Sequence, residues 1–172
     1  MRIKTWQIIT VIICLILGTF LHFTYEWSRE NMIVGVFSAV NESTWEHLKL
    51  IYYPMIFMAI IGYFVIGKKS QNYFGAQTVG ILIAIIFTIV FFYTYTGIIG
   101  TNYAVVNISI FVVSIILGGC VTYKILKSRI VYNVEVASII FLIILLLSFV
   151  LYTFNPPQIQ LFQDPVDNSY GI

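Results

Sequence analysis

The chain has 172 residues, of which 60% are hydrophobic and only 9% charged, and its formal net charge is +2. About a quarter of the residues of a soluble domain are charged, so this composition excludes a water-soluble fold and predicts a single domain in the lipid bilayer. A small net charge with no basic face also excludes a nucleic-acid partner.

Five segments are long and apolar enough to cross a bilayer, which takes about 20 mainly apolar residues. The connections between them fall where turn-forming and charged residues cluster, at 67–72, 97–102 and 124–133. The sequence therefore predicts an all-α fold, a polytopic membrane helical bundle that forms one domain over residues 1–154. Its five transmembrane helices are expected over residues 6–25, 45–66, 76–99, 104–123 and 134–154.

The basic residues predict the orientation of the bundle, because short cytoplasmic loops are enriched in lysine and arginine. Only Arg29 and Lys49 fall on the side opposite the N-terminus. This distribution predicts an N-in, C-out topology. The first span is expected to be a retained signal-anchor helix, because it is long and no small-x-small cleavage site follows it. The basic residues on the N-terminal side are Arg2, Lys4, Lys68, Lys69, Lys124, Lys127 and Arg129.

Two features flank the start of the second span. Residues 31–40 are too short to cross a bilayer and too apolar for an ordinary exposed loop, so they predict a short interfacial or re-entrant helix. Within the second span, Pro54 predicts a kink, since proline removes one helical hydrogen bond and clashes with the carbonyl of Leu50.

Small residues recur every four positions in the third and fourth spans, which predicts close helix packing, either inside the bundle or between two copies of the chain. They are Ala76, Gly80, Ala84 and Thr88, then Ser114, Gly118 and Thr122.

Residues 155–172 follow the last span as an extracytoplasmic C-terminal tail. Pro156 and Pro157 end the helix, and the residues after them are more apolar than a disordered segment usually is. We expect the tail to fold over the mouth of the bundle and to bring Asp164 or Asp167 close to the second span. A frayed tail that lies on the lipid headgroups is the alternative.

Most of the ionisable chemistry lies between the first two spans. Both histidines and four of the seven acidic residues fall between positions 22 and 47, and ionisable groups at a membrane boundary are usually functional because they are costly to desolvate. His22 and Glu26 are four residues apart and share a helix face. We predict His22, Glu26, Glu42 and His47 as catalytic acid–base residues. His22, Glu42 and His47 are also candidate ligands of a divalent metal.

Residues 41–49 also have the pattern of a helix start. Ser43 and Glu46 fit the capping box, in which each side chain bonds the backbone N–H of the other residue, and Asn41 is an alternative cap. Glu46 and Lys49, three residues apart, predict an ion pair near the headgroups.

An outward-facing pocket beside this cluster would be lined by aromatic and polar side chains. Asn107 is expected either to face this pocket or to bond a neighbouring helix. The residues predicted to bind a ligand are Trp27, Asn41, Trp45, Lys49, Tyr52, Asn107 and Asp164.

Three stretches together resemble a family of small bacterial integral-membrane proteins that is defined only as a domain of unknown function. The resemblance would cover nearly the whole chain and implies a multi-pass protein of the bacterial plasma membrane. It implies no activity, ligand or site residue. The stretches are His22-Phe23-x-Tyr25-Glu26-Trp27-Ser28, Asn41-Glu42-Ser43-x-Trp45-Glu46-His47-x-Lys49, and the tail with Pro156-Pro157 and Asp164-Pro165.

Three functions fit these observations. The first is a membrane-embedded hydrolase or transferase that acts on a lipid or lipid-linked substrate, although no H-E-x-x-H zinc motif or nucleophile elbow is present. The second is a small-solute binding or transport component, which would not be proton-coupled because no charge lies deep in any span. The third is a non-catalytic assembly or regulatory subunit.

Overall fold

The computed structural model describes residues 1–128 and 134–172. The secondary-structure elements assigned among these residues are all helices. This confirms the predicted all-α fold. The α-helices are α1 (Ile3–Trp27), α2 (Met32–Gly35), α3 (Thr44–Val65), α4 (Tyr73–Ile99), α5 (Ala104–Lys127) and α6 (Glu135–Phe154), and two short 3₁₀ helices are η1 (Gly67–Lys69) and η2 (Gln160–Phe162).

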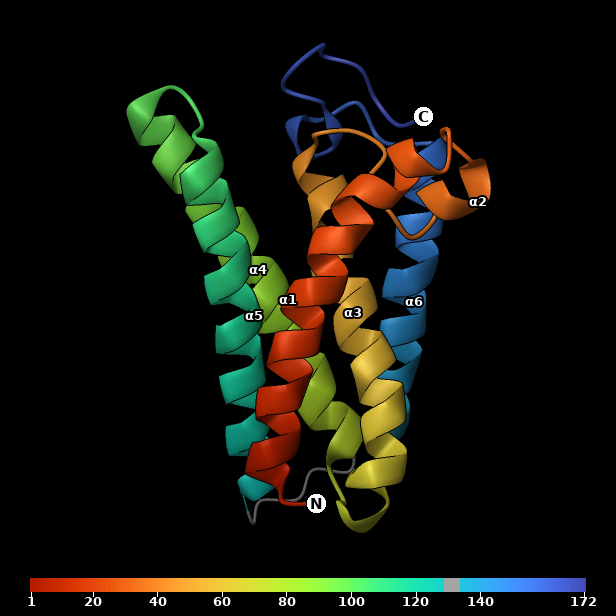
Figure 1. The fold of residues 1–172 in the computed structure, drawn as a ribbon, viewed down its shortest axis with the longest axis vertical. Coiled ribbons are helices and arrows are strands. Elements are labelled where there is room, and N and C mark those ends of the chain that lie inside the picture. Colours follow the sequence, from red (N-terminus) through yellow and green to blue (C-terminus); the bar gives the residue numbers. More distant parts are fainter. Residues whose placement is uncertain (129–133) are drawn as a thin grey trace.

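Five of these helices, α1, α3, α4, α5 and α6, are long and apolar enough to cross a membrane. Each coincides with a predicted span, and most extend a few residues beyond the predicted ends. Of the predicted connection at 124–133, Arg129 and its neighbours up to residue 133 lie outside the described residues. The N-terminus and the C-terminal tail lie at opposite ends of the bundle (Figure 1), and the N-in, C-out topology stays a prediction.

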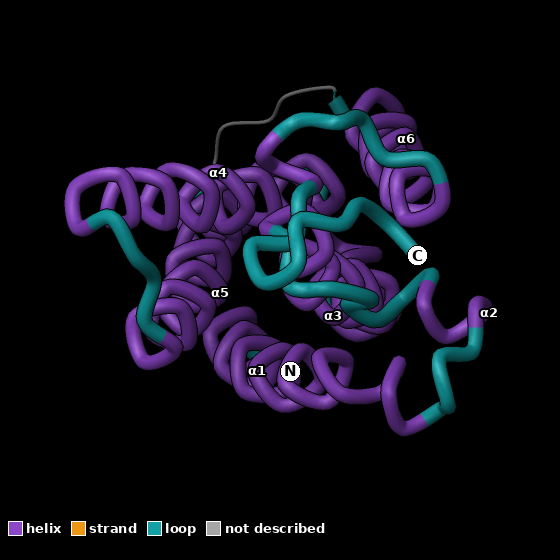
Figure 2. The backbone as a smooth tube through the Cα atoms, turned by 90° about the horizontal axis from the view of Figure 1, so that it is seen from above, coloured by secondary structure: helices purple, strands orange, loops and turns teal. Residues whose placement is uncertain are grey.

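The helix α3 lies in the middle of the bundle, with α1, α4, α5 and α6 around it (Figure 2). It is also the most buried of the five long helices. At the end of the bundle that carries the tail, which we call the C-terminal end, α4 and α5 lean away from α1 and α3 (Figure 1).

The α4–α5 pair packs through its small residues. A methyl group added at Gly80 would lie 2.7 Å from the carbonyl oxygen of Gly118, and the reverse substitution meets the carbonyl oxygen of Gly80 at the same distance. Thr122 Oγ1 also donates a hydrogen bond to the carbonyl oxygen of Ala76, at 3.3 Å. In lipid there is no net hydrophobic driving force between helices, so close packing of this kind stabilises their association. The repeated small residues therefore serve packing inside the bundle.

The helix α3 continues through Pro54, which is buried. Proline has no N–H to donate to the carbonyl four residues earlier, here that of Leu50. This carbonyl faces α1, where a methyl group added at Gly18 would lie 2.5 Å from it. The absence of a side chain at Gly18 thus lets α1 lie directly against the backbone of α3 below the tail.

The predicted short helix between the first two spans is only four residues long, as α2. Its side chains Met32 and Ile33 are 62% and 75% exposed, whereas Ser38 just after it is fully buried. The hydroxyl of Ser38 accepts a hydrogen bond from the backbone N–H of Tyr25 at 3.0 Å and donates to the carbonyl of Leu21. The segment thus covers the end of α1 and presents an apolar face outward.

Candidate functional site

The start of α3 is capped by its own side chains. Ser43 Oγ accepts a hydrogen bond from the backbone N–H of Glu46 at 3.3 Å, which confirms the serine half of the predicted capping box. The other half is wrong, because the N–H of Ser43 donates to Asn41 Oδ1 at 3.0 Å rather than to the carboxylate of Glu46. Asn41 and Ser43 therefore share the capping of this helix.

The carboxylate of Glu46 instead forms a buried ion pair with Lys49, at 2.5 Å. It also accepts a hydrogen bond from the N–H of Val40 at 3.1 Å. The ammonium group of Lys49 donates to the carbonyl of Gly35 and to Thr153 Oγ1, each at 2.8 Å. The pair is 1% and 0% exposed, so it lies inside the protein rather than near the headgroups. Lys49 ties α2 and α6 to α3 and does not reach the cavity described below.

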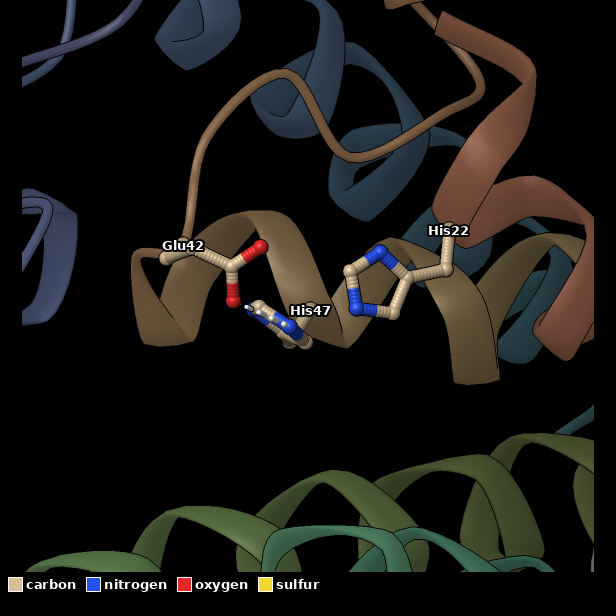
Figure 3. A group of neighbouring side chains, drawn as sticks. All are labelled: His22, Glu42 and His47. Atoms are coloured by element: carbon tan, nitrogen blue, oxygen red, sulfur yellow. Dashed lines mark ion pairs between the residues drawn. The ribbon is translucent and has the colours of Figure 1, made fainter. Parts of the chain in front are cut away.

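The opposite side of the same motif brings three ligand-type side chains together. Figure 3 shows His22 on α1, His47 in the first turn of α3 and Glu42 in the loop just before it, with their side chains turned toward one another. His47 Nε2 lies 3.5 Å from Glu42 Oε2, and the two imidazole rings meet edge to face with centroids 5.1 Å apart. One ligand atom from each of the three residues lies within 4.8 Å of the other two.

The orientation of His47 is set by the backbone. Its Nδ1 lies 2.9 Å from the carbonyl oxygen of Ser43, one turn earlier in the helix. A carbonyl oxygen only accepts, so Nδ1 carries the proton and donates it. The lone pair of a neutral imidazole is then on Nε2, the atom that faces Glu42. Metal-binding histidines are usually held in this way, with the second nitrogen donating to a backbone carbonyl or carboxylate.

The spacing of the three groups suits a small divalent ion. Zinc binds imidazole nitrogen and carboxylate oxygen at about 2.0–2.2 Å, so ligand atoms of a tetrahedral site are roughly 3.3–3.5 Å apart. The separation of 3.5 Å between His47 and Glu42 agrees with this value. The most distant pair of ligand atoms in the group is at most 4.8 Å apart, which exceeds the spacing in a tetrahedral site by at most about 1.5 Å. A change in the side-chain conformation of the half-buried His22 would close this difference. No described residue hydrogen-bonds the His22 imidazole, whose ring stacks on Phe23 with centroids 4.9 Å apart.

A cavity of about 400 Å³ adjoins the three side chains. Its polar end contains His22, Glu42, His47 and Asn107, and Gly18, Leu50 and Phe111 line its apolar depth. Ligand cavities in proteins commonly enclose about 300–1,000 Å³, with a mostly apolar lining and a few polar groups. The cavity lies where α4 and α5 lean away from α1 and α3.

Asn107 fits both of its predicted environments. It lines the cavity, and its Oδ1 accepts a hydrogen bond from the Tyr95 hydroxyl of α4. Its amide Nδ2 donates to Asn102 Oδ1 at 3.3 Å, and Asn102 also lines the cavity. In the sequence, Asn102 and Asn107 are two amides at one end of the fourth span, and this pairing is a signal that the prediction for Asn107 alone does not use.

The tail lies against the start of α3. The carboxylate of Asp164 accepts a hydrogen bond from the backbone N–H of Glu42 at 2.9 Å, and Asn41 Nδ2 donates to the carbonyl of Gly171 at 3.1 Å. Pro165 and Val166 line the cavity. Asp167 is exposed and bonds within the tail, where hydrogen bonds from Ser169 lower the pKa of its carboxyl group.

Several residues predicted for the site lie elsewhere. Glu26 is exposed and is not one of the described residues that line the cavity or join the ligand group. Trp27 is 63% exposed and stacks on Phe23. Trp45 packs between Phe149 of α6 and Phe162 of the tail, with centroids 4.7 and 4.8 Å away. Tyr52 is fully buried and donates to the carbonyl of Leu142 at 2.6 Å.

Other residues line the cavity without having been predicted to do so. Most come from α1, α4 and α5, and most are apolar residues or threonines whose type alone indicates only membrane packing. The one local signal is a glycine within an apolar span, as at position 18. They include Gly18, Thr19, Phe23, Thr88, Phe92, Ile108, Ile110 and Phe111.

Comparison with known proteins identifies a family and no function. The model of a family described as "Family of unknown function (DUF6512)" matches residues 1–172. No curated protein and no solved structure matches the chain.

Proposed function

This chain belongs to that family of unknown function, and we propose that it is a membrane-embedded hydrolase that uses a divalent metal ion. The observation that carries the proposal is the convergence of His22, Glu42 and His47, whose ligand atoms lie within 4.8 Å of one another beside a cavity of about 400 Å³. The residues that hold these groups come from two membrane helices and the loop before the second.

The donor set supports hydrolysis. Catalytic zinc sites commonly have three protein ligands, including the combination of two histidines and one glutamate, and keep the fourth position for water or substrate. A divalent metal held by His22, Glu42 and His47 would supply a bound water that is acidic enough to act as the nucleophile in the hydrolysis of an acyl or phosphoryl ester.

The position of the centre supports action at the outer leaflet. The three residues lie at the C-terminal end of the bundle, opposite the N-terminus, and most of the basic residues are in the loops at the N-terminal end. By the positive-inside rule the N-terminal end faces the cytoplasm. On the resemblance to bacterial membrane proteins, we place the centre at the outer face of the bacterial plasma membrane.

A small-solute binding or transport component is the second candidate, because the cavity alone would bind a ligand without chemistry. The aromatic side chains Trp27, Trp45 and Tyr52, which were expected to line such a pocket, are not among the described residues at this cavity. A non-catalytic subunit is the third candidate, and no specific contact favours it. Metal binding separates the first candidate from both.

The test is metal analysis of the purified protein after loading with zinc and removal of unbound ion. We expect one zinc per chain in the wild type and its loss in His47→Ala, Glu42→Ala and His22→Ala. Glu26→Ala is the matched control, because Glu26 is an exposed carboxylate one turn from His22. A wild type that binds no stoichiometric zinc, manganese or iron overturns the proposal.

A further inference from the structure

The cavity beside His22, Glu42 and His47, which we call the metal-ligand group, is lined along one flank by exposed residues. Four of its lining residues are exposed and belong to membrane-spanning helices: Thr19 and Phe23 on α1, and Ala104 and Ile108 on α5. A residue that lines a cavity and is also exposed lies at its rim. The rim therefore includes a gap between α1 and α5, at the level of the membrane helices.

The gap is confined to the C-terminal end. Deeper in the bundle the two helices are in contact, since a methyl group added at Gly119 of α5 would lie 2.6 Å from the Val11 side chain of α1. Phe111 approaches Gly18 in the same manner at the floor of the cavity. The opening is thus a short slot that starts at the metal-ligand group and closes about one to two helical turns below it.

The surface on both sides of the slot is apolar, as is typical of a surface that faces lipid. The exposed large side chains of α1 include Ile12, Ile16 and Phe20, and those of α5 include Val105, Val113 and Ile116. A molecule that passes through the slot therefore comes from the bilayer and not from water. The cavity also has exposed lining residues at its aqueous end, Asn102 and Val166, through which water can reach the same centre.

We propose that the cavity binds a membrane phospholipid, which enters sideways between α1 and α5 and places its phosphate at the metal-ligand group. This inference rests on the proposed metal centre and names its substrate class. A bound divalent ion attracts the phosphate oxygens, and the amides of Asn102 and Asn107 supply donors at the same end. The apolar residues Gly18, Leu50 and Phe111 accompany the upper part of an acyl chain, and the remainder of the lipid stays in the bilayer.

The polarity gradient of the cavity is what favours a lipid over a free phosphate compound. A soluble phosphate ester would leave the apolar depth of the cavity unfilled, whereas a lipid chain removes that surface from water at about 25 cal/mol per Å². A soluble ligand would enter from the aqueous end of the cavity and would not need the slot between α1 and α5.

The test is photo-crosslinking in vesicles of phosphatidylcholine that contain a small fraction of phosphatidic acid with a diazirine on its acyl chain close to the glycerol. Labelled peptides are identified by mass spectrometry in the zinc-loaded full chain. We expect label concentrated in residues 18–23 and 104–111. Ile108→Trp, which fills the rim with a larger side chain, should lower it at least about fivefold, because the indole occupies space that the lipid chain must pass. Ile116→Trp, on the same helix but away from the cavity, should not.

A second rim variant, a soluble competitor and a zinc measurement distinguish the possible outcomes of this experiment. Thr19→Trp fills the opposite rim and replaces Ile108→Trp if that variant does not fold, as judged by thermal unfolding. Equal labelling of all lipid-facing segments, or labelling unchanged in both rim variants, overturns the lipid site. Displacement of the label by excess glycerol 3-phosphate overturns it in favour of a soluble phosphate ligand. Zinc content is measured on the same samples, so slot labelling without bound zinc would refute the metal centre and leave the lipid site standing.

Discussion

The backbone carbonyl of Ser43 accepts a hydrogen bond from Nδ1 of His47, at 2.9 Å. This single contact fixes the tautomer of His47 and turns Nε2 toward Glu42. Ser43 at the same time caps α3 through its hydroxyl group. The residue that caps the helix therefore also orients the imidazole, and the capping of α3 and the proposed metal-ligand role of the motif are joined at one position.

The first prediction concerns Asp164, which accepts the backbone N–H of Glu42 and so holds the loop that carries this ligand. Loss of an outer-shell partner typically weakens metal binding by about 10–100-fold. We expect this loss in Asp164→Ala, measured as the zinc dissociation constant by competition with a chromophoric chelator. Asp167→Ala is the control, because Asp167 is an exposed carboxylate of the same tail that accepts a hydrogen bond from the backbone N–H of Ser169. Equal affinities in the two variants would show that the Asp164 contact does not support the centre.

The second prediction concerns the buried pair Glu46 and Lys49. Removing one member leaves a buried charge without its partner, which costs about 3–5 kcal/mol. Lys49→Met should therefore destabilise the protein strongly, whereas Glu46→Gln together with Lys49→Met should destabilise it much less than the sum of the two single changes. Unfolding in detergent, analysed as a double-mutant cycle, measures this coupling. Strict additivity would mean that the two charges do not interact.

The five membrane helices could be predicted because their signal is local: apolar length decides it, and no tertiary contact is needed. The same reasoning located His22, Glu42 and His47, because ionisable residues are so few in this chain that those near one membrane boundary are readily recognised. The structure places these three side chains together although His22 and Glu42 are 20 positions apart in the sequence.

The remaining site residues depend on contacts that spacing does not encode. The capping-box pattern assigns Glu46 a local partner, yet its carboxylate is taken by Lys49 and by the backbone of Val40. Trp45 and Tyr52 are aromatic residues at a membrane boundary, and both turn toward α6 instead of the cavity. Helical periodicity sets the face of α3 on which each residue lies. Which of these faces is covered depends on where α6 and the tail pack, and these elements lie about 100 residues further along the chain.

A third prediction tests the glycine contact between α4 and α5. Gly118→Ala places a methyl group 2.7 Å from the carbonyl oxygen of Gly80, which forces the helices apart, and overpacking typically costs about 1–3 kcal/mol. We expect a lower thermal midpoint. Gly97→Ala in α4 is the control, because a methyl group there meets no atom within 4 Å, and replacing a helical glycine gains about 0.5–1 kcal/mol. A midpoint that is unchanged by Gly118→Ala would mean that the two helices can separate at no cost.

The last prediction concerns Trp45, whose ring is packed between α6 and the tail. Its centroid lies 4.7 Å from that of Phe149 and 4.8 Å from that of Phe162, so it holds η2 against the bundle. Trp45→Ala should cost about 3–5 kcal/mol if the site does not collapse, and much of this cost falls on the attachment of the tail. We expect a protease to remove residues after Pro157 faster in this variant than in the wild type. Trp27→Ala, which removes an indole that is 63% exposed, should leave the cleavage rate unchanged.

Because Asp164 follows Phe162 by two residues, release of the tail also withdraws the acceptor of the Glu42 N–H. Zinc affinity in Trp45→Ala should therefore fall toward that of Asp164→Ala. Faster cleavage of the tail without any loss of zinc affinity would show that the packing of Trp45 on the tail does not support the contact between Asp164 and Glu42.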